Sequence, residues 1–122
     1  MWTLSKQFKF EASHKLPLHD GKCSRLHGHS WTGYIVCSGE SLQEQGAKSG
    51  MLIDYSTVGK IAKELCEDFL DHYHLNDSLG LENPTSEEIA RWVYAKVKPF
   101  LHEMLKAIVI EETCTSRCEY SE

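Results

Sequence analysis

Clustered positive charge is absent from this sequence, which has no basic run and no stripe of lysine and arginine interleaved with aromatic residues. The formal net charge is −5, and such a balance disfavours nucleic-acid binding, because phosphates attract clustered cations. Long hydrophobic runs are absent too, since the longest strongly apolar stretch, residues 107–110, is far too short to span a membrane. The first residues carry no apolar stretch typical of a signal peptide, so we expect a cytoplasmic protein with no membrane partner.

Paired Cys-x-x-Cys motifs are also missing, although the chain contains five cysteines. An odd number of cysteines without a secretory signal favours reduced thiols over a disulfide framework. Neither the GxGxxG fingerprint of dinucleotide-binding proteins nor the HExxH motif of zinc hydrolases occurs. No repeat, linker or low-complexity segment divides the chain, so we expect residues 1–122 to form a single domain.

Hydrophobic patterning predicts an α+β fold with the element order ββααββ, in which two helices cover one face of an antiparallel sheet. The expected strands are 2–13, 27–38, 107–113 and a short final strand at 118–121. Residues 39–50 are polar, contain three glycines and are expected to form a loop. A sheet of four strands has two open edges, and pairing of edges between subunits would close it into a β-barrel.

The two expected helices have recognisable N-terminal signals. Asp54 is a suitable N-cap for a helix whose apolar spacing continues through Leu70. The second helix begins at a capping box formed by Thr85 and Glu88. We expect it to end before Pro99, because proline removes a backbone donor and clashes with the preceding turn.

Three histidines form a candidate metal site. His27 and His29 are two residues apart on an expected strand, so their rings point to the same face. His14, brought across a hairpin, would complete a set of three nitrogen donors, which is typical of catalytic zinc with its open fourth position. Gly28 is expected to keep bulk away from the ion. The alternative interpretation is that these imidazoles line a solvated strand face.

Cys23 lies close to this candidate metal site in the sequence. A nearby cation lowers the pKa of a thiol, which suits Cys23 as a base or nucleophile. Two alternatives remain. Cys23 could instead be a fourth ligand that closes a structural zinc site, or simply a small buried apolar side chain.

Asp71 and His72 are a candidate acid–base pair, because a carboxylate can orient an imidazole and raise its basicity. The other interpretation is a helix C-terminus, where imidazoles interact with the last carbonyls, and His74 fits that better. Glu112 ends an expected strand and could accept two parallel hydrogen bonds from an amidine-like ring edge such as that of a pterin. It could equally be a solvated strand-end carboxylate.

Seven motifs in chain order carry a resemblance to a known family. They are Phe10–His14, Cys23-x3-His27-Gly28-His29, Gly50-x3-Asp54, Leu70-Asp71-His72, Leu75-Asn76, Asn83–Glu87 and Glu112-Thr113. Together they are similar to the pterin synthases, a family that includes 6-pyruvoyl- and 6-carboxytetrahydropterin synthases. The three-residue spacing between Cys23 and His27 is similar to the carboxy branch, which acts in queuosine biosynthesis.

The resemblance implies the tunnelling fold, in which subunits assemble as trimers or hexamers around a closed β-barrel. It implies a lyase that converts 7,8-dihydroneopterin triphosphate to 6-carboxytetrahydropterin, acetaldehyde and triphosphate. The alternatives are the pyruvoyl product, which keeps the side chain, and a zinc-binding module without catalysis.

The resemblance also assigns roles to particular residues. It implies one Zn²⁺ per subunit, held by His14, His27 and His29. Cys23 would be the general base, and Asp71 with His72 would form a proton relay with which Glu112 is grouped. Pterin recognition would involve Glu112, Thr85 and Ser86. Active sites would lie between subunits, so that Cys23 and His72 meet from different chains.

Overall fold

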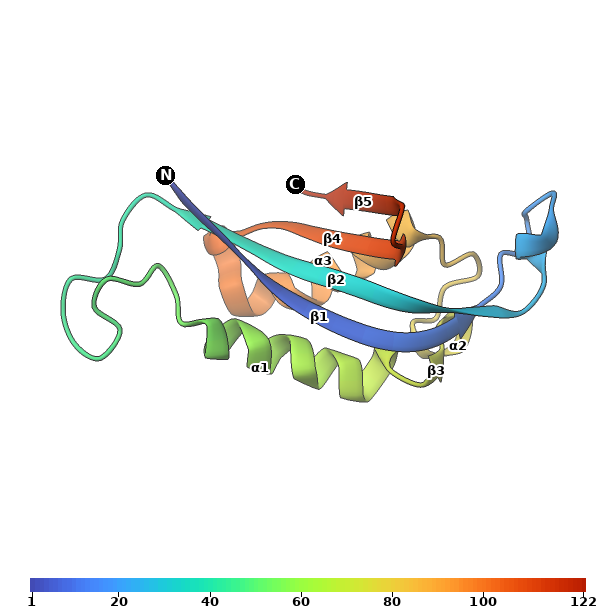
Figure 1. The fold of residues 1–122 in the computed structure, drawn as a ribbon, viewed down its shortest axis with the longest axis horizontal. Coiled ribbons are helices and arrows are strands. Elements are labelled where there is room, and N and C mark those ends of the chain that lie inside the picture. The colour runs from blue at the N-terminus through green and yellow to red at the C-terminus, as the bar shows by residue number, and fades with distance from the viewer.

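A five-stranded sheet with helices on one face forms the framework of the protein (Figure 1). The computed structural model describes all residues, 1–122. The elements are β1 (Trp2–His14), β2 (His27–Gly39), α1 (Tyr55–Leu65), β3 (Tyr73–His74), α2 (Leu75–Ser78), α3 (Ser86–Leu101), β4 (Leu105–Thr113) and β5 (Ser116–Tyr120). The α+β class, with its two long helices on one side, is therefore confirmed. No helix has the length and apolar character needed to cross a membrane.

The strands are arranged in the order β3-β1-β2-β4-β5. β1 and β2 form a long antiparallel hairpin that is paired from Trp2 opposite Gly39 to His14 opposite His27. β3 adds a short parallel pairing at one end of β1. The sequence pattern predicts only four strands, because a strand of two residues is too short to show a period.

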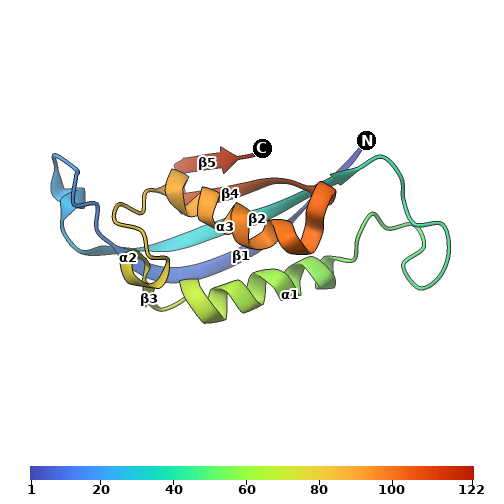
Figure 2. The same cartoon turned by 180° about the vertical axis from the view of Figure 1, so that it is seen from behind.

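Side chains alternate across the sheet, and one face is covered by helices (Figure 2). On this covered face, Phe8, Phe10, Trp31 and Ile35 are all buried. They pack in one core with the apolar faces of α1 and α3. Each fully buried apolar side chain of this size contributes about 1.5–3 kcal/mol to folding. α1 and α3 begin at opposite ends of the sheet (Figures 1 and 2).

The first long helix begins as predicted, with the Asp54 side chain accepting a hydrogen bond from the Ser56 backbone N–H at 2.9 Å. Its α-helical part ends at Leu65, earlier than the sequence pattern predicts, and a π-helical turn covers Cys66–Leu70. Leu65 and Leu70 are both buried although they are five residues apart. The wider i→i+5 turn suits that spacing better than an α-turn does.

The prediction that the second long helix ends before Pro99 is wrong, because α3 continues to Leu101. Pro99 lies in the last turn, where its missing N–H removes only one helical hydrogen bond. Leu101 is only 7% exposed, and the His102 N–H still bonds to the Lys98 carbonyl. Burial of Leu101 thus stabilises a final turn that local propensity disfavours.

Candidate functional site

Three imidazoles meet at one end of the covered face of the sheet. His14 lies directly opposite His27, and His29 lies two residues further along β2, so all three rings project to the same side. Their ring centroids are 4.5–5.2 Å apart, and one nitrogen of each lies within 4.8 Å of the others. The three histidines are therefore positioned to hold a metal ion.

Backbone carbonyls orient two of these rings. His14 Nδ1 lies 2.9 Å from the Pro84 carbonyl, and His27 Nδ1 lies 2.7 Å from the Arg25 carbonyl. Because a carbonyl only accepts, each Nδ1 carries the proton and each Nε2 keeps its lone pair. The Nε2 atoms of His14, His27 and His29 are all buried without a hydrogen-bond partner. A buried acceptor left unpaired is costly, so this donor set fits a bound cation.

The surroundings of His14 and His29 favour the neutral imidazole, the form that binds metals. His14 has no exposed surface, and burial is the main cause that lowers its pKa below the ordinary value. Burial also lowers the pKa of His29, and the nearby Glu112 carboxylate partly opposes that change. The buried Trp31 ring packs edge-on against both histidines, with centroids 5.0 and 5.2 Å away.

Glu112, near the end of β4, lies beside the imidazoles. Its Oε1 is 3.5 Å from His29 Nε2, and its side chain is 26% exposed. The N-terminus of α3 lies at the same end of the sheet, because Pro84, which contacts His14, directly precedes the Thr85 N-cap. The Thr85 hydroxyl accepts a hydrogen bond from the Glu88 N–H at 3.2 Å. Ser86 donates to the neighbouring Glu87 carboxylate at 2.8 Å.

Cys23 lies in a 3₁₀ turn, Lys22–Ser24, that connects the two strands of the hairpin. Its carbonyl accepts a hydrogen bond from the Leu16 N–H at 2.9 Å, which holds the turn against the end of β1. The half-buried thiol lines a hollow of about 400 Å³ together with His27 and His29. Cys23 does not belong to the cluster of converging donor atoms.

Asp71 and His72 do form a hydrogen-bonded pair, with Asp71 Oδ2 and His72 Nδ1 2.9 Å apart. The other carboxylate oxygen of Asp71 accepts from the Glu11 N–H at 2.8 Å. This backbone hydrogen bond is the main cause that lowers the pKa of Asp71, and the bond to His72 adds to it. The His72 ring is 80% exposed, and its backbone adopts a left-handed conformation with φ 64°.

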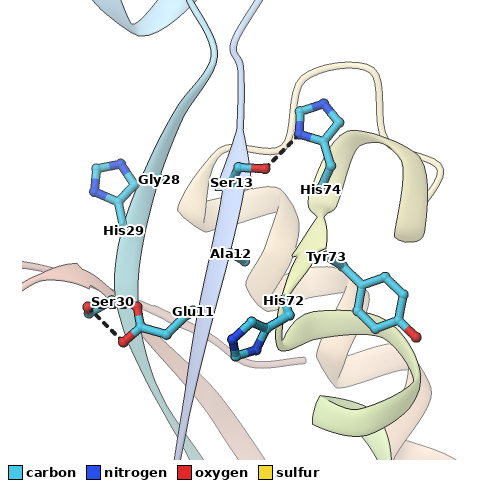
Figure 3. A pocket seen from close by; sticks show the side chains of 9 residues that line it. All are labelled: Glu11, Ala12, Ser13, Gly28, His29, Ser30, His72, Tyr73 and His74. Atoms are coloured by element: carbon cyan, nitrogen blue, oxygen red, sulfur yellow. Dashed lines mark hydrogen bonds between the residues drawn. The ribbon is translucent and has the colours of Figure 1, made fainter.

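A second hollow, of about 660 Å³, lies next to this pair (Figure 3). Its lining includes Glu11 and Ser30, whose hydroxyl lies 2.7 and 2.9 Å from the two Glu11 carboxylate oxygens. Gly28 lines it as well, and a Cβ atom there would make only an ordinary 3.6 Å contact with the Ala12 carbonyl. The prediction that Gly28 keeps bulk away from the ion is therefore wrong, because alternation places it on the other face from its histidine neighbours.

The structure divides the predicted site residues into two groups. The first group is the imidazole cluster of His14, His27 and His29, with Glu112 and Cys23 beside it. The start of α3, with Thr85 and Ser86, lies at the same end of the sheet. Asp71 and His72 pair at the β1 edge, and His72 lines a hollow that does not include Cys23. Within one chain, Cys23 and His72 are thus not brought into a common hollow.

Sequence reasoning missed several contacts that hold the site. The carbonyls of Pro84 and Arg25 orient two histidines, but a backbone acceptor leaves no signal in residue type. Trp31 was assigned only to a strand, although its position two residues after His29 places it on the same face. Asn76 also went without a role, and its amide bonds both the N–H and the carbonyl of Lys15, at 3.0 and 2.9 Å.

Comparison with known proteins agrees with the motifs. The family described as 6-pyruvoyl tetrahydropterin synthase matches residues 3–122. A protein from Synechocystis sp. named 6-carboxy-5,6,7,8-tetrahydropterin synthase is 47% identical over 120 residues, covering 98% of this chain and 93% of the relative. A protein of the same name from Haemophilus influenzae is 34% identical over 142 residues and covers both chains completely.

A solved structure shows the same fold. The 6-pyruvoyl tetrahydropterin synthase of Caenorhabditis elegans superposes with a TM-score of 0.83 at 25% identity, covering 99% of this chain and 95% of the other. The resemblance inferred from seven short motifs is thereby confirmed along nearly the whole chain. The protein is an enzyme that belongs to the 6-pyruvoyl tetrahydropterin synthase family.

Proposed function

We propose that this enzyme converts 7,8-dihydroneopterin triphosphate to 6-carboxytetrahydropterin, releasing acetaldehyde and triphosphate, with one Zn²⁺ per subunit. The observation that carries the proposal is the cluster of three buried, unpartnered Nε2 atoms, with the Cys23 thiol and the Glu112 carboxylate beside it. The 47% identity to a protein named for the carboxy activity supports the choice of product. Imidazole donors suit Zn²⁺ among several transition metals.

Binding of the pterin ring is assigned to Glu112 and the Thr85–Ser86 turn. A carboxylate can accept two parallel hydrogen bonds from the amidine-like edge of a pterin. The Thr85 hydroxyl oxygen already accepts the cap hydrogen bond of α3, which leaves its O–H and the main chain of the turn for the ring. This arrangement would place the side chain of the substrate towards His27, His29 and Cys23.

Bound zinc would supply Lewis acidity that polarises the side-chain hydroxyls of the substrate. The Cys23 thiolate removes a proton from the side chain, and His72, oriented by Asp71, exchanges protons at the neighbouring carbon. Transfer of these hydrogens to the ring reduces the dihydropterin without an external reductant. Triphosphate leaves by elimination, and cleavage of a carbon–carbon bond with uptake of water leaves a ring carboxylate and acetaldehyde.

The proposal includes an oligomer whose active sites lie between subunits. Cys23 and His72 line different hollows of one chain, which supports a site in which a second chain brings them to one substrate. β5 and most of β1 form open edges of the sheet, and edge pairing in a trimer or hexamer would cover them. A cytoplasmic location and a place in queuosine biosynthesis complete the proposal.

Mass spectrometry of the products tests the reaction. The zinc-loaded protein is incubated with 7,8-dihydroneopterin triphosphate, and carboxytetrahydropterin plus acetaldehyde is the expected result. A pyruvoyl product, which keeps all side-chain carbons, would instead identify the enzyme as a 6-pyruvoyltetrahydropterin synthase. The matching family and the Caenorhabditis elegans structure both carry the name of that activity. Absence of any product from zinc-loaded protein would contradict both.

Substitution of Cys23 separates its proposed role from that of a ligand. Cys23→Ala is expected to keep zinc and to lose turnover by about 10²–10⁴-fold, the contribution of a well-placed general base. Metal content by elemental analysis and turnover are measured on the same sample. If Cys23→Ala strips the zinc, the thiol is a ligand and the assignment of three imidazoles alone is wrong.

A further inference from the structure

Two cationic side chains flank Cys23 in the turn between β1 and β2. Lys22 and Arg25 are three residues apart across a 3₁₀ turn, and side chains at that spacing lie on the same side. Both line the hollow of about 400 Å³ that Cys23 shares with His27 and His29. The cations therefore border the same space as the candidate zinc ligands.

Neither cation has a carboxylate partner. The chain has three arginines, and the other two, Arg91 and Arg117, both lie within 4.0 Å of glutamates. No acidic group lies that close to Arg25 or Lys22, although the chain carries a net charge of −5. An unpaired arginine in an acidic protein, placed beside a metal site, is available for an anionic ligand.

Hydrogen bonds hold the turn that carries these side chains. The Arg25 N–H donates to the Lys22 carbonyl at 3.1 Å, and the Ser24 hydroxyl donates to the Gly21 carbonyl at 3.0 Å. The Arg25 carbonyl accepts from His27 Nδ1, so the backbone of Arg25 is fixed to a ring of the imidazole cluster. These hydrogen bonds thus fix the backbone that carries the two cations next to the imidazole cluster.

We propose that Lys22 and Arg25 bind the polyphosphate tail of the substrate and stabilise it as the leaving group. This inference rests on the proposed function, which supplies a substrate with a triphosphate. A guanidinium pairs with phosphate oxygens through two parallel hydrogen bonds, and an ammonium adds a compact point charge. Negative charge that develops on the departing triphosphate is stabilised by fixed cations at this position.

Binding measurements on a variant without turnover test the inference directly. Cys23→Ala, loaded with zinc, serves as the parent, and isothermal titration calorimetry measures its affinity for 7,8-dihydroneopterin and for the triphosphate. Lys22→Met and Arg25→Met are added singly and together. Lys60→Met, which removes an exposed cation on α1 that does not line this hollow, is the matched control.

We expect each substitution at the turn to weaken triphosphate binding about tenfold, in line with the loss of a charge-assisted hydrogen bond. Affinity for phosphate-free dihydroneopterin is expected to change by less than about twofold, because the ring contacts are elsewhere. Arg25→Lys, which keeps the charge but loses the planar fork, is expected to fall between parent and Arg25→Met. Metal content and circular dichroism of each variant confirm that zinc and fold are retained.

The outcomes distinguish this inference from the proposed function. If the parent binds both ligands and the double variant keeps the preference for the triphosphate, the tail is bound elsewhere and only this inference is overturned. Equal weakening of both ligands also overturns it, because the cations would then act on the pterin. If the parent binds neither ligand, the proposed function falls, and this inference falls with it.

Discussion

Two stretches of the covered face both contain buried rings and differ in which polar atoms they leave without a hydrogen bond. In the apolar stretch, Phe10 stacks on Trp31 with ring centroids 5.8 Å apart, and both are at most 2% exposed. In the imidazole stretch, His14 is equally buried, yet its Nε2 has no hydrogen-bond partner, and neither do the Nε2 atoms of His27 and His29. The comparison shows that one part of a sheet face can pack entirely through apolar contacts, while the next part presents nitrogen atoms that fit a metal ion.

The largest effect is expected in the apolar stretch. Phe10→Ala removes a stacked ring and leaves a cavity, so we expect a loss of about 3–5 kcal/mol in the free energy of unfolding, measured by chemical denaturation. Phe100→Ala is the matched control, because Phe100 is 64% exposed and its loss is expected to cost less than about 0.5 kcal/mol. Folded Phe10→Ala that no longer takes up zinc would show that the two stretches are not independent.

The second largest effect is expected in the imidazole stretch. His27→Ala removes one of three converging donors, and we expect zinc affinity to fall at least about 100-fold, or about 2.7 kcal/mol. The readout is the rise in melting temperature that zinc produces, which should be lost in the variant. His19→Ala is the control, since His19 contacts only its own turn. An unchanged zinc-induced shift in His27→Ala would remove His27 from the ligand set.

Substitution of Thr85 tests whether the start of α3 stabilises the fold, binds the substrate or does both. Thr85→Ala removes the oxygen that accepts from the Glu88 N–H, and we expect a loss of about 1 kcal/mol in unfolding free energy. Thr85→Ser keeps a capping hydroxyl and should restore most of it. A loss of pterin affinity in Thr85→Ala that Thr85→Ser restores would show that the hydroxyl also contacts the ring.

The smallest effect is expected at the far end of the sheet, where Asp54 caps α1. Its hydrogen bond with Lys48 is the main cause that lowers its pKa to about 2 from the ordinary 3.8, and bonds from Ser56 add to it. A lowered pKa in the folded state gives stability that is complete above pH 3.8 and is lost as the pH falls towards 2.

Asp54→Asn isolates this charge, because asparagine is an equally good N-cap. We expect wild type to be slightly more stable than the variant at neutral pH, and the difference to vanish near pH 2. Melting temperatures of the two proteins across pH 2–7 give the comparison. A difference that persists at pH 2 would mean that hydrogen-bond geometry, not charge, is what asparagine lacks.

Periodicity predicted the long strands and helices because each carries many side chains on one buried face. The pairing of Asp71 with His72 was predictable from adjacency, and the convergence of His27 with His29 from the alternation of a strand. The sequence places His14 with them only by assuming a hairpin, and the register that sets His14 opposite His27 is seen in the structure.

Other features depend on tertiary contacts that no local pattern records. The π-turn at Cys66–Leu70 and the helical turn beyond Pro99 both exist because a buried leucine requires them. Pro84 and Arg25 act through carbonyl oxygens, which every residue has. Gly28 was misjudged because alternation places it on the face opposite the histidines that flank it.

The left-handed backbone of His72 has a consequence for how this protein can change by mutation. A side chain at φ 64° strains the main chain, on the order of 1–3 kcal/mol, whereas glycine adopts this conformation freely. A search for thermostable variants that screens for melting temperature alone would therefore favour His72→Gly. The same substitution removes the ring that Asp71 orients, so stability and the proposed proton relay are in conflict at this one position.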